Sequence, residues 1–198
     1  MNAMVKQTAL VFTLALSLVS APAIADGQPG LTLNQERLNG PRLGVSYVVQ
    51  HDKLDRDGTF KRRLQEADMD VLISQFGWHF EWLVAPETGG PAFVTEVLPF
   101  VGGVEYGKII PSVSLVLGIR MPQGFEFGMG PNVLTTFDPD DPVNTSLVLA
   151  AGQSVRFGDV RIPLNLALLT NKGGNRVCFV FGYAMPEIRR KKSRENTW

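Results

Sequence analysis

The sequence is poor in cysteine and histidine, has no charge imbalance, and has no long apolar run beyond its first 25 residues. A single cysteine, Cys178, excludes an internal disulfide and is expected to be a packed thiol. Without about 18 consecutive apolar residues, no membrane-spanning helix is expected. The 19 basic and 19 acidic residues balance, which argues against nucleic acid as the main partner.

The first 25 residues have the three-part pattern of an export signal. Lys6 supplies a positive charge, residues 9–20 form a short apolar stretch, and residues 23–25 read Ala-Ile-Ala. We expect cleavage after Ala25, so that residues 1–25 are a signal peptide and the remaining chain is exported. That remainder has the length of one domain.

Most of the remaining chain alternates between apolar residues and small or polar ones. Successive side chains of a strand point to opposite faces, so this pattern indicates strands with one apolar face. The clearest example, residues 176–185, reads Arg-Val-Cys-Phe-Val-Phe-Gly-Tyr-Ala-Met. The pattern occurs in eight segments, approximately 41–50, 71–84, 92–102, 111–121, 124–133, 144–157, 159–169 and 176–185. A tilted strand of about ten residues crosses a bilayer. We therefore predict an all-β fold, an eight-stranded antiparallel up-and-down transmembrane β-barrel over residues 40–185.

The connections between these segments differ in length. Short turns are expected at residues 86–91, 122–123 and 158–159, long loops at 51–70 and 132–143, and intermediate connections at 103–110 and 170–175. Short turns at one end and longer loops at the other are typical of outer-membrane barrels. Pro163 lies inside the seventh segment, and because proline cannot donate to a ladder, we expect a bulge or loosened pairing there.

The two faces of the strands favour a membrane barrel over a soluble one. A soluble barrel, such as a periplasmic carrier of the lipocalin type, would carry Lys, Glu, Asp and Thr on its outer face. Here the less apolar face is mostly Gly, Ser, Ala and Val, which suits the narrow interior of eight strands. The other face carries aromatic residues of the kind that meet lipid. The predicted lipid-facing aromatic residues are Tyr47, Phe76, Trp78, Phe80, Trp82, Phe125, Phe127, Phe179, Phe181 and Tyr183.

The opposite face of the strands contains isolated charged and amide residues, which we expect to line the lumen. The predicted polar network consists of Arg42, Gln75, His79, Glu81, Glu96, Arg120, Glu126, Arg161, Asn165 and Arg176. Buried charges must be paired and hydrogen-bonded, and arginine can hold a carboxylate with two bonds. A polar plug that fills the lumen is the favoured interpretation, and a narrow channel is the alternative.

The sequence contains no recognisable catalytic, cofactor or metal motif. Lipid A enzymes of the outer membrane use histidine with serine, which requires hydrogen-bond contact between the two side chains. His79 and Ser74 fall on opposite strand faces, and His51 has no evident serine partner. We therefore expect neither an enzyme nor a bound cofactor. An enzyme that modifies lipid A is kept as an alternative function.

Residues 40–185 resemble the small outer-membrane β-barrels of Gram-negative bacteria, of the OmpA-transmembrane-domain and OmpX type. The resemblance depends on the number of strands, their alternation, the loop pattern and the ending Phe179-x-Phe181-x-Tyr183. The resemblance implies a monomer in the outer membrane, with lipid, lipopolysaccharide and the barrel-assembly machinery as partners. Residues 26–39 would be an N-terminal periplasmic segment and residues 186–198 a basic disordered tail. We expect a structural or surface-interaction role.

Overall fold

The computed structural model describes residues 36–49, 64–86, 90–135, 142–171 and 174–184, and the backbone of residues 187–188. All of these belong to the second of two units into which the chain divides, Thr32–Trp198. The expected signal peptide, with its cleavage site at Ala25, and the tail beyond residue 188 lie outside the described residues. Among the described residues, no helix combines the length and hydrophobicity needed to cross a bilayer.

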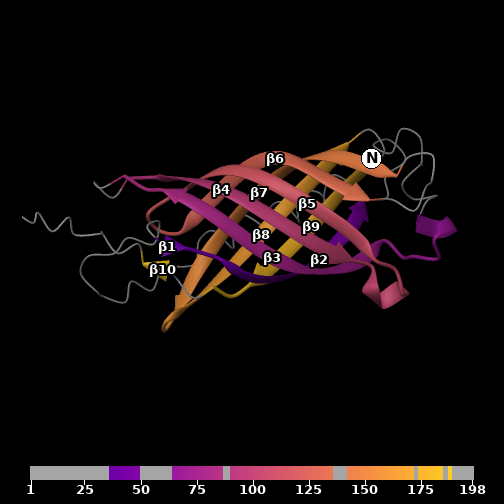
Figure 1. The fold of residues 1–198 in the computed structure, drawn as a ribbon, viewed down its shortest axis with the longest axis horizontal. Helices are drawn as coiled ribbons and strands as arrows, with labels where there is room; N and C mark the ends of the chain where they lie inside the picture. The colour runs from indigo at the N-terminus through magenta and orange to yellow at the C-terminus, as the bar shows by residue number, and fades with distance from the viewer. Residues whose placement is uncertain are drawn as a thin grey trace, which may run out of the picture. The chain divides into compact units, whose positions relative to one another are not determined.

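Eight antiparallel strands close into a barrel in which each strand pairs with its neighbours along the chain, and β2 pairs with β9 to complete the ring (Figure 1). The strands are β2 (Gly40–Val49), β3 (Leu72–Val84), β4 (Ala92–Gly102), β5 (Ile110–Arg120), β6 (Phe125–Thr135), β7 (Val143–Phe157), β8 (Val160–Asn171) and β9 (Gly174–Gly182). This confirms the predicted all-β, eight-stranded, antiparallel up-and-down barrel.

Two short elements lie at one end of the barrel, which we call the terminal end. There β1 (Glu36–Arg37) pairs with β10 (Glu187–Ile188) in a separate two-stranded sheet. The opposite end, the loop end, carries the 3₁₀ turn η3 (Val104–Tyr106). The segments that lead into and out of the barrel therefore meet at the same end.

Two predicted connections are wrong. The long loop expected at residues 132–143 is shorter, because β6 extends to Thr135 and its last residues pair with β5 and β7. Residues 170–175 were expected to form a connection of intermediate length between the last two strands. Instead, β8 extends to Asn171 and β9 begins at Gly174, and these two residues are paired. The alternating pattern of the sequence weakens at Thr170 and Asn175, although the backbone ladder continues past both residues.

Prolines inside the strands lie where one of the two flanking ladders is interrupted. Pro163 is paired with Ser154 on β7, but the ladder with β9 begins only at Leu164. Pro99 and Pro131 are likewise paired on one side, to β5 and β7, and missing from the ladder on the other side. Since proline has no N–H to donate, the barrel loses few ladder bonds by placing it there. The loosened pairing expected at Pro163 is found.

The interior is filled in successive layers, which can be followed along β5. Ile110, at the loop end, belongs to an apolar cap; Ser114 is polar; Val116 belongs to a second apolar layer, and Arg120 is charged. The apolar cap consists of Val48, Leu64, Met69, Ile73, Ile110 and Leu134. The apolar middle layer consists of Phe100, Val116, Val148, Leu169, Cys178 and Val180. Buried Cys178 is thus the packed thiol expected from the sequence.

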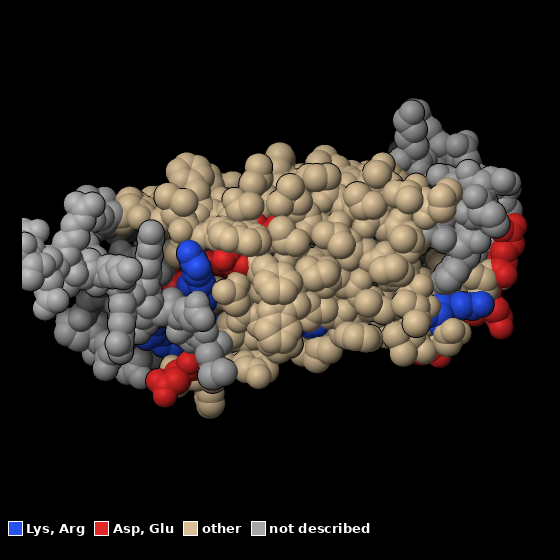
Figure 2. Space-filling model, viewed as in Figure 1, with Lys and Arg blue, Asp and Glu red and all other residues tan. Residues whose placement is uncertain are grey.

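The outer surface of the described strands carries no charged residue. Each of the eight strands contains a single Lys, Arg, Asp or Glu, and all of these occupy inward-facing positions. These residues are Arg42, Glu81, Glu96, Arg120, Glu126, Arg156, Arg161 and Arg176. Large apolar side chains point outward instead, with Leu117 59% and Trp82 53% exposed. In the face shown in Figure 2, charged side chains gather toward the two ends.

A close approach between strands explains the glycine at position 77 and gives a first testable prediction. A Cβ atom at Gly77 would lie 2.0 Å from the carbonyl oxygen of Pro99 on β4, so alanine requires the backbone to shift. We expect Gly77→Ala to lower the free energy of unfolding by about 1–3 kcal/mol, as overpacking does. Urea unfolding of the folded barrel measures this.

The matched control for this substitution is Gly90→Ala. The nearest heavy atom to a Cβ at Gly90 lies 3.5 Å away, an ordinary van der Waals contact. Equal unfolding midpoints for the two variants would contradict the close approach between β3 and β4.

Candidate functional site: the charged cluster inside the barrel

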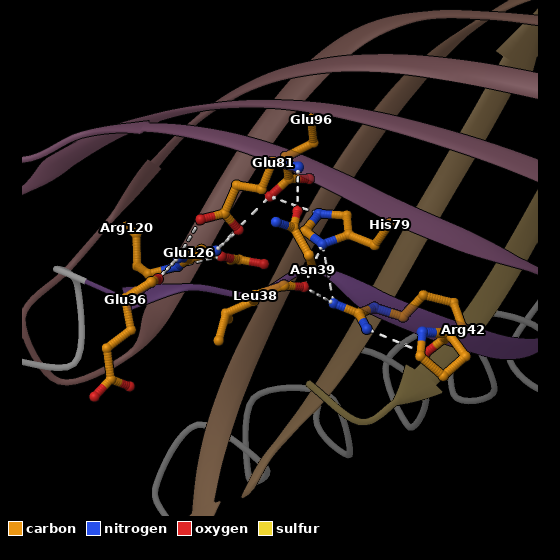
Figure 3. A network of polar contacts seen from close by, with 10 residues as sticks. Glu36, Leu38, Asn39, Arg42, His79, Glu81, Glu96, Arg120 and Glu126 are labelled. Carbon is orange, nitrogen blue, oxygen red and sulfur yellow. Dashed lines mark hydrogen bonds and ion pairs between the residues drawn. The ribbon is translucent and has the colours of Figure 1, made fainter. Parts of the chain in front are cut away.

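Charged side chains from seven strands and from the segment before β2 converge inside the terminal end of the barrel. Figure 3 shows those of β2 to β6 together with Glu36. Strand alternation directs each of them inward, and the register of the ladders brings them to similar depth. We call the following residues the inner cluster: Glu36, Arg42, His79, Glu81, Glu96, Arg120, Glu126, Arg156 and Arg161. Seven of these nine residues belong to the predicted polar network, and the other two, Glu36 and Arg156, were not predicted.

Arg120 is the centre of the inner cluster. It is fully buried, and two of its nitrogens hold the carboxylate of Glu81, with Nη1–Oε1 and Nη2–Oε2 distances of 2.9 and 2.5 Å. Its Nε donates to Oε2 of Glu126 at 2.7 Å. Glu96 is more distant, with Oε1 4.0 Å from Nη2. Three carboxylates therefore surround one guanidinium, and two of them make close ion pairs with it.

Two further close ion pairs use Glu36, from the segment before the barrel. Oε2 of Glu36 accepts hydrogen bonds from Nε and Nη2 of Arg161 at 2.9 and 2.7 Å, and Oε1 accepts one from Arg156. Its backbone carbonyl also accepts a hydrogen bond from Nη1 of Arg120 at 3.1 Å. The carboxylate that neutralises the arginines of β7 and β8 is thus supplied from outside the eight strands.

Residues 36–39 fill the terminal end of the lumen. Leu38 is buried, and its carbonyl accepts hydrogen bonds from Nη2 of Arg42 at 2.7 Å and from Nδ1 of His79 at 2.8 Å. The side-chain oxygen of Asn39 accepts the backbone N–H of Glu81 at 2.8 Å. Sequence analysis grouped these four residues with the N-terminal segment and did not predict these contacts. A four-residue segment is too short to show a periodic pattern, so no sequence signal marks it.

His79 is 2% exposed and is held by contacts at one edge of its ring only. Nδ1 lies near both the Leu38 carbonyl oxygen and Nη2 of Arg42; in the neutral tautomer that donates from Nδ1 to this carbonyl, Nε2 presents its lone pair. Among the described residues, Nε2 has no hydrogen-bond partner, and Oε1 of Glu96 lies 3.5 Å from it. A cavity of about 20 Å³, lined by Glu96, Glu126 and Asn165 among others, adjoins this region. That volume is sufficient for about one water molecule.

The other residues of the predicted polar network lie apart from the inner cluster. Arg176, near the loop end, donates to the side-chain oxygen of Asn132 at 3.3 Å. Asn132 also bonds the hydroxyls of Ser114 and Ser146, which gives a second polar layer between the apolar cap and the apolar middle layer. Gln75 is half-buried on β3, and Asn165 borders the small cavity. The predicted residues therefore occupy two depths that are separated by apolar side chains.

The ten predicted lipid-facing aromatic residues all occupy outward-facing positions, and nine of them are exposed, whereas Phe125 is half-buried. Neighbouring outward positions on one strand bring some of the rings into contact. The ring centroids of Trp78 and Phe80 are 6.4 Å apart, and those of Phe179 and Phe181 are 6.0 Å apart. The barrel thus presents aromatic surface outward and ion pairs inward.

The serine considered for lipid A chemistry faces away from His79. Ser74 is exposed at the loop end, where its amide and hydroxyl each donate to the Glu105 carboxylate at 2.5 Å. Partial burial acts to raise the pKa of Glu105, but these two hydrogen bonds outweigh it and lower the pKa below its usual value. His51, the other histidine, lies outside the described residues.

Comparison of the chain with protein-family models, with curated proteins and with solved structures gives no significant match.

Removal of the central guanidinium gives the second prediction. Arg120→Met would leave the buried carboxylates of Glu81 and Glu126 without their partner, which costs about 3–5 kcal/mol of unfolding free energy. Addition of Glu81→Gln to this variant removes one unpaired charge and should restore part of the loss. Denaturant unfolding in detergent measures all three proteins.

Arg156→Met serves as the control, because the side chain of Arg156 is 31% exposed and its partner Glu36 keeps Arg161. A loss for Arg120→Met no larger than that for Arg156→Met would show that the ion pairs of Arg120 are not central to stability.

Proposed function

We propose that this protein is a small outer-membrane β-barrel of the OmpA-transmembrane-domain and OmpX type, with a closed interior and a structural or surface-interaction role. The single observation that carries the proposal is the position of the charges. Every charged residue of the eight described strands faces inward, and large apolar residues face outward. In water this large apolar outer surface would be exposed unfavourably, whereas the hydrocarbon core of a membrane is apolar in the same way.

The filled interior favours a structural role over transport. The inner cluster closes the terminal end, and the apolar middle layer lies between it and the polar layer of Asn132. An ion moving through the lumen would have to displace ion pairs and then cross packed apolar side chains, which is energetically costly. Residues 36–39 add backbone to the same lumen, so the barrel is better suited to act as a rigid support than as a passage.

The proposed setting defines the partners. Lipid and lipopolysaccharide would contact the aromatic and aliphatic outer surface, and the barrel-assembly machinery would recognise the final strand through Phe179, Phe181 and Tyr183. The loop end carries the Ser74–Glu105 contact and would face the exterior, with the connections of residues 51–70 and 136–142 as the interaction surface. The protein acts as a monomer in this proposal, and its role involves no chemical step.

A charge placed on the outer surface gives the third prediction. Leu117→Arg puts a guanidinium on the outer face of β5, where the leucine is 59% exposed. In a bilayer we expect the substitution to cost about 2–4 kcal/mol of folding free energy. Folding into lipid vesicles, followed by the heat-dependent shift in gel migration, measures the loss.

The outcome separates the membrane barrel from a soluble one, such as a periplasmic carrier of the lipocalin type. In a soluble barrel Leu117→Arg would be neutral or would improve solubility, and the native protein would be extracted without detergent. Leu117→Gln is the control for loss of the leucine alone. Unchanged vesicle folding of Leu117→Arg together with detergent-free extraction would exclude the membrane assignment.

The fourth prediction concerns the channel alternative. The folded protein in a planar bilayer should show no sustained large conductance. Deletion of residues 26–39 should still not produce one, because the apolar middle layer remains in place. Sustained conductance of the intact protein would replace the structural role with a pore, and conductance of the deletion variant alone would identify residues 36–39 as the barrier.

A change in the lipid A mass profile of cells that express the protein, abolished by His51→Gln, would favour the enzyme alternative.

A further inference from the structure

Inside the inner cluster, Nε2 of His79 and two nearby carboxylates are arranged as metal ligands are. His79 Nε2, Glu81 and Glu96 offer ligand atoms that all lie within 4.8 Å of one another, and all three residues are buried. The distance of 3.5 Å between Nε2 and Oε1 of Glu96 is long for a hydrogen bond. Two neighbouring ligands of a tetrahedral zinc ion, each at about 2.0–2.2 Å from the metal, are separated by roughly 3.3–3.6 Å.

Nδ1 of His79 lies 2.8 Å from the Leu38 carbonyl oxygen and 3.0 Å from Nη2 of Arg42. The tautomer that donates from Nδ1 to the carbonyl is the one that a metal requires, because in it the lone pair of Nε2 points toward Glu96. Histidines that bind metal commonly donate their other ring nitrogen to a carbonyl in this way. Glu81 is oriented by its two hydrogen bonds from Arg120, and each carboxylate oxygen keeps a further lone pair for a ligand.

The charges around His79 favour a cation. Glu81, Glu96 and Glu126 contribute three negative charges, and Arg120 and Arg42 contribute two positive ones, which leaves a net charge of −1 when the imidazole is neutral. Arg42 lies at the Nδ1 edge of the ring, with Nη2 3.0 Å from Nδ1, and so away from the side that faces Glu96. The Arg42 guanidinium therefore does not block that side.

We propose that His79, Glu81 and Glu96 form a binding site for a divalent transition metal of the zinc type. One nitrogen and two carboxylate oxygens suit an ion that accepts both kinds of ligand. Sites with three protein ligands complete their coordination with water. A cavity of about 20 Å³, enough for about one water molecule, borders one of the three ligands, Glu96, but not His79 or Glu81. The bound ion would join β3 to β4 and, through the Leu38 carbonyl, hold residues 36–39 in the lumen.

The fifth prediction tests this site with zinc as the probe. The untagged, full-length protein is folded in detergent, stripped with a chelator, and titrated with Zn²⁺ by calorimetry. We expect one ion per chain, and we expect His79→Gln and Glu96→Gln each to weaken binding at least tenfold. Zn²⁺ should also raise the unfolding temperature of the original protein, because a ligand that binds only the folded state stabilises it. Neither variant should show this increase.

The control variants keep the test specific. His51→Gln removes the other histidine, and Glu105→Gln removes an exposed carboxylate at the loop end; both should bind Zn²⁺ as the original protein does. Gel migration before and after heating verifies that every variant is folded, and His79→Gln, which keeps a polar side chain, is the variant of choice if Glu96→Gln does not fold.

Absence of stoichiometric binding to the original protein, or equal affinity in His79→Gln, would overturn the proposal and leave His79 and Glu96 as a pair that shares a proton. Neither result would affect the membrane assignment, which depends on the outer surface alone.

Discussion

The need to neutralise inward-facing charge in a narrow space is the constraint on which the rest of the structure depends. Eight strands enclose an interior only wide enough for side chains to fill, and each described strand contributes one charged residue to it. Arg120 makes ion pairs with Glu81 and Glu126, and Glu36 makes ion pairs with Arg156 and Arg161, so these charges neutralise one another. The outer surface of the eight described barrel strands carries no charged residue, because every charged residue of these strands points inward.

Much of the fold follows from alternation alone. The runs around Trp78 and Phe179 define both the strands and their outward faces, since a period of two leaves only one assignment of faces once the apolar side is known. The proline inside the seventh segment also predicted a structural feature correctly. Pro163 has no N–H to donate, so it has to lie where one of the two flanking ladders is interrupted. The hairpin between Asn171 and Gly174 was missed because backbone pairing continues where the side-chain pattern has ended.

The candidate site was less accessible from sequence. Alternation predicts that Arg120 and Arg176 share the lumen, but their depths depend on the stagger between strands, which no single strand encodes. Contacts between β5 and β3 put Arg120 beside Glu81, whereas Arg176 lies beside Asn132, beyond the apolar middle layer. Glu36 was missed for another reason: it belongs to a segment with no periodicity, and only its position inside the barrel shows what it pairs with.

The pairing of β1 with β10 links the two ends of the described chain and has a consequence for biogenesis. Glu36 reaches its arginines from a segment whose backbone pairs with residues that follow the last strand of the barrel. During synthesis these later residues emerge after the last strand of the barrel, so the backbone pairing of the segment that carries Glu36 forms only after all eight barrel strands have been made. Ring closure needs only the pairing of β2 with β9, so a chain interrupted before residue 187 would keep its ring and its arginines but lose one anchor of the carboxylate that serves them.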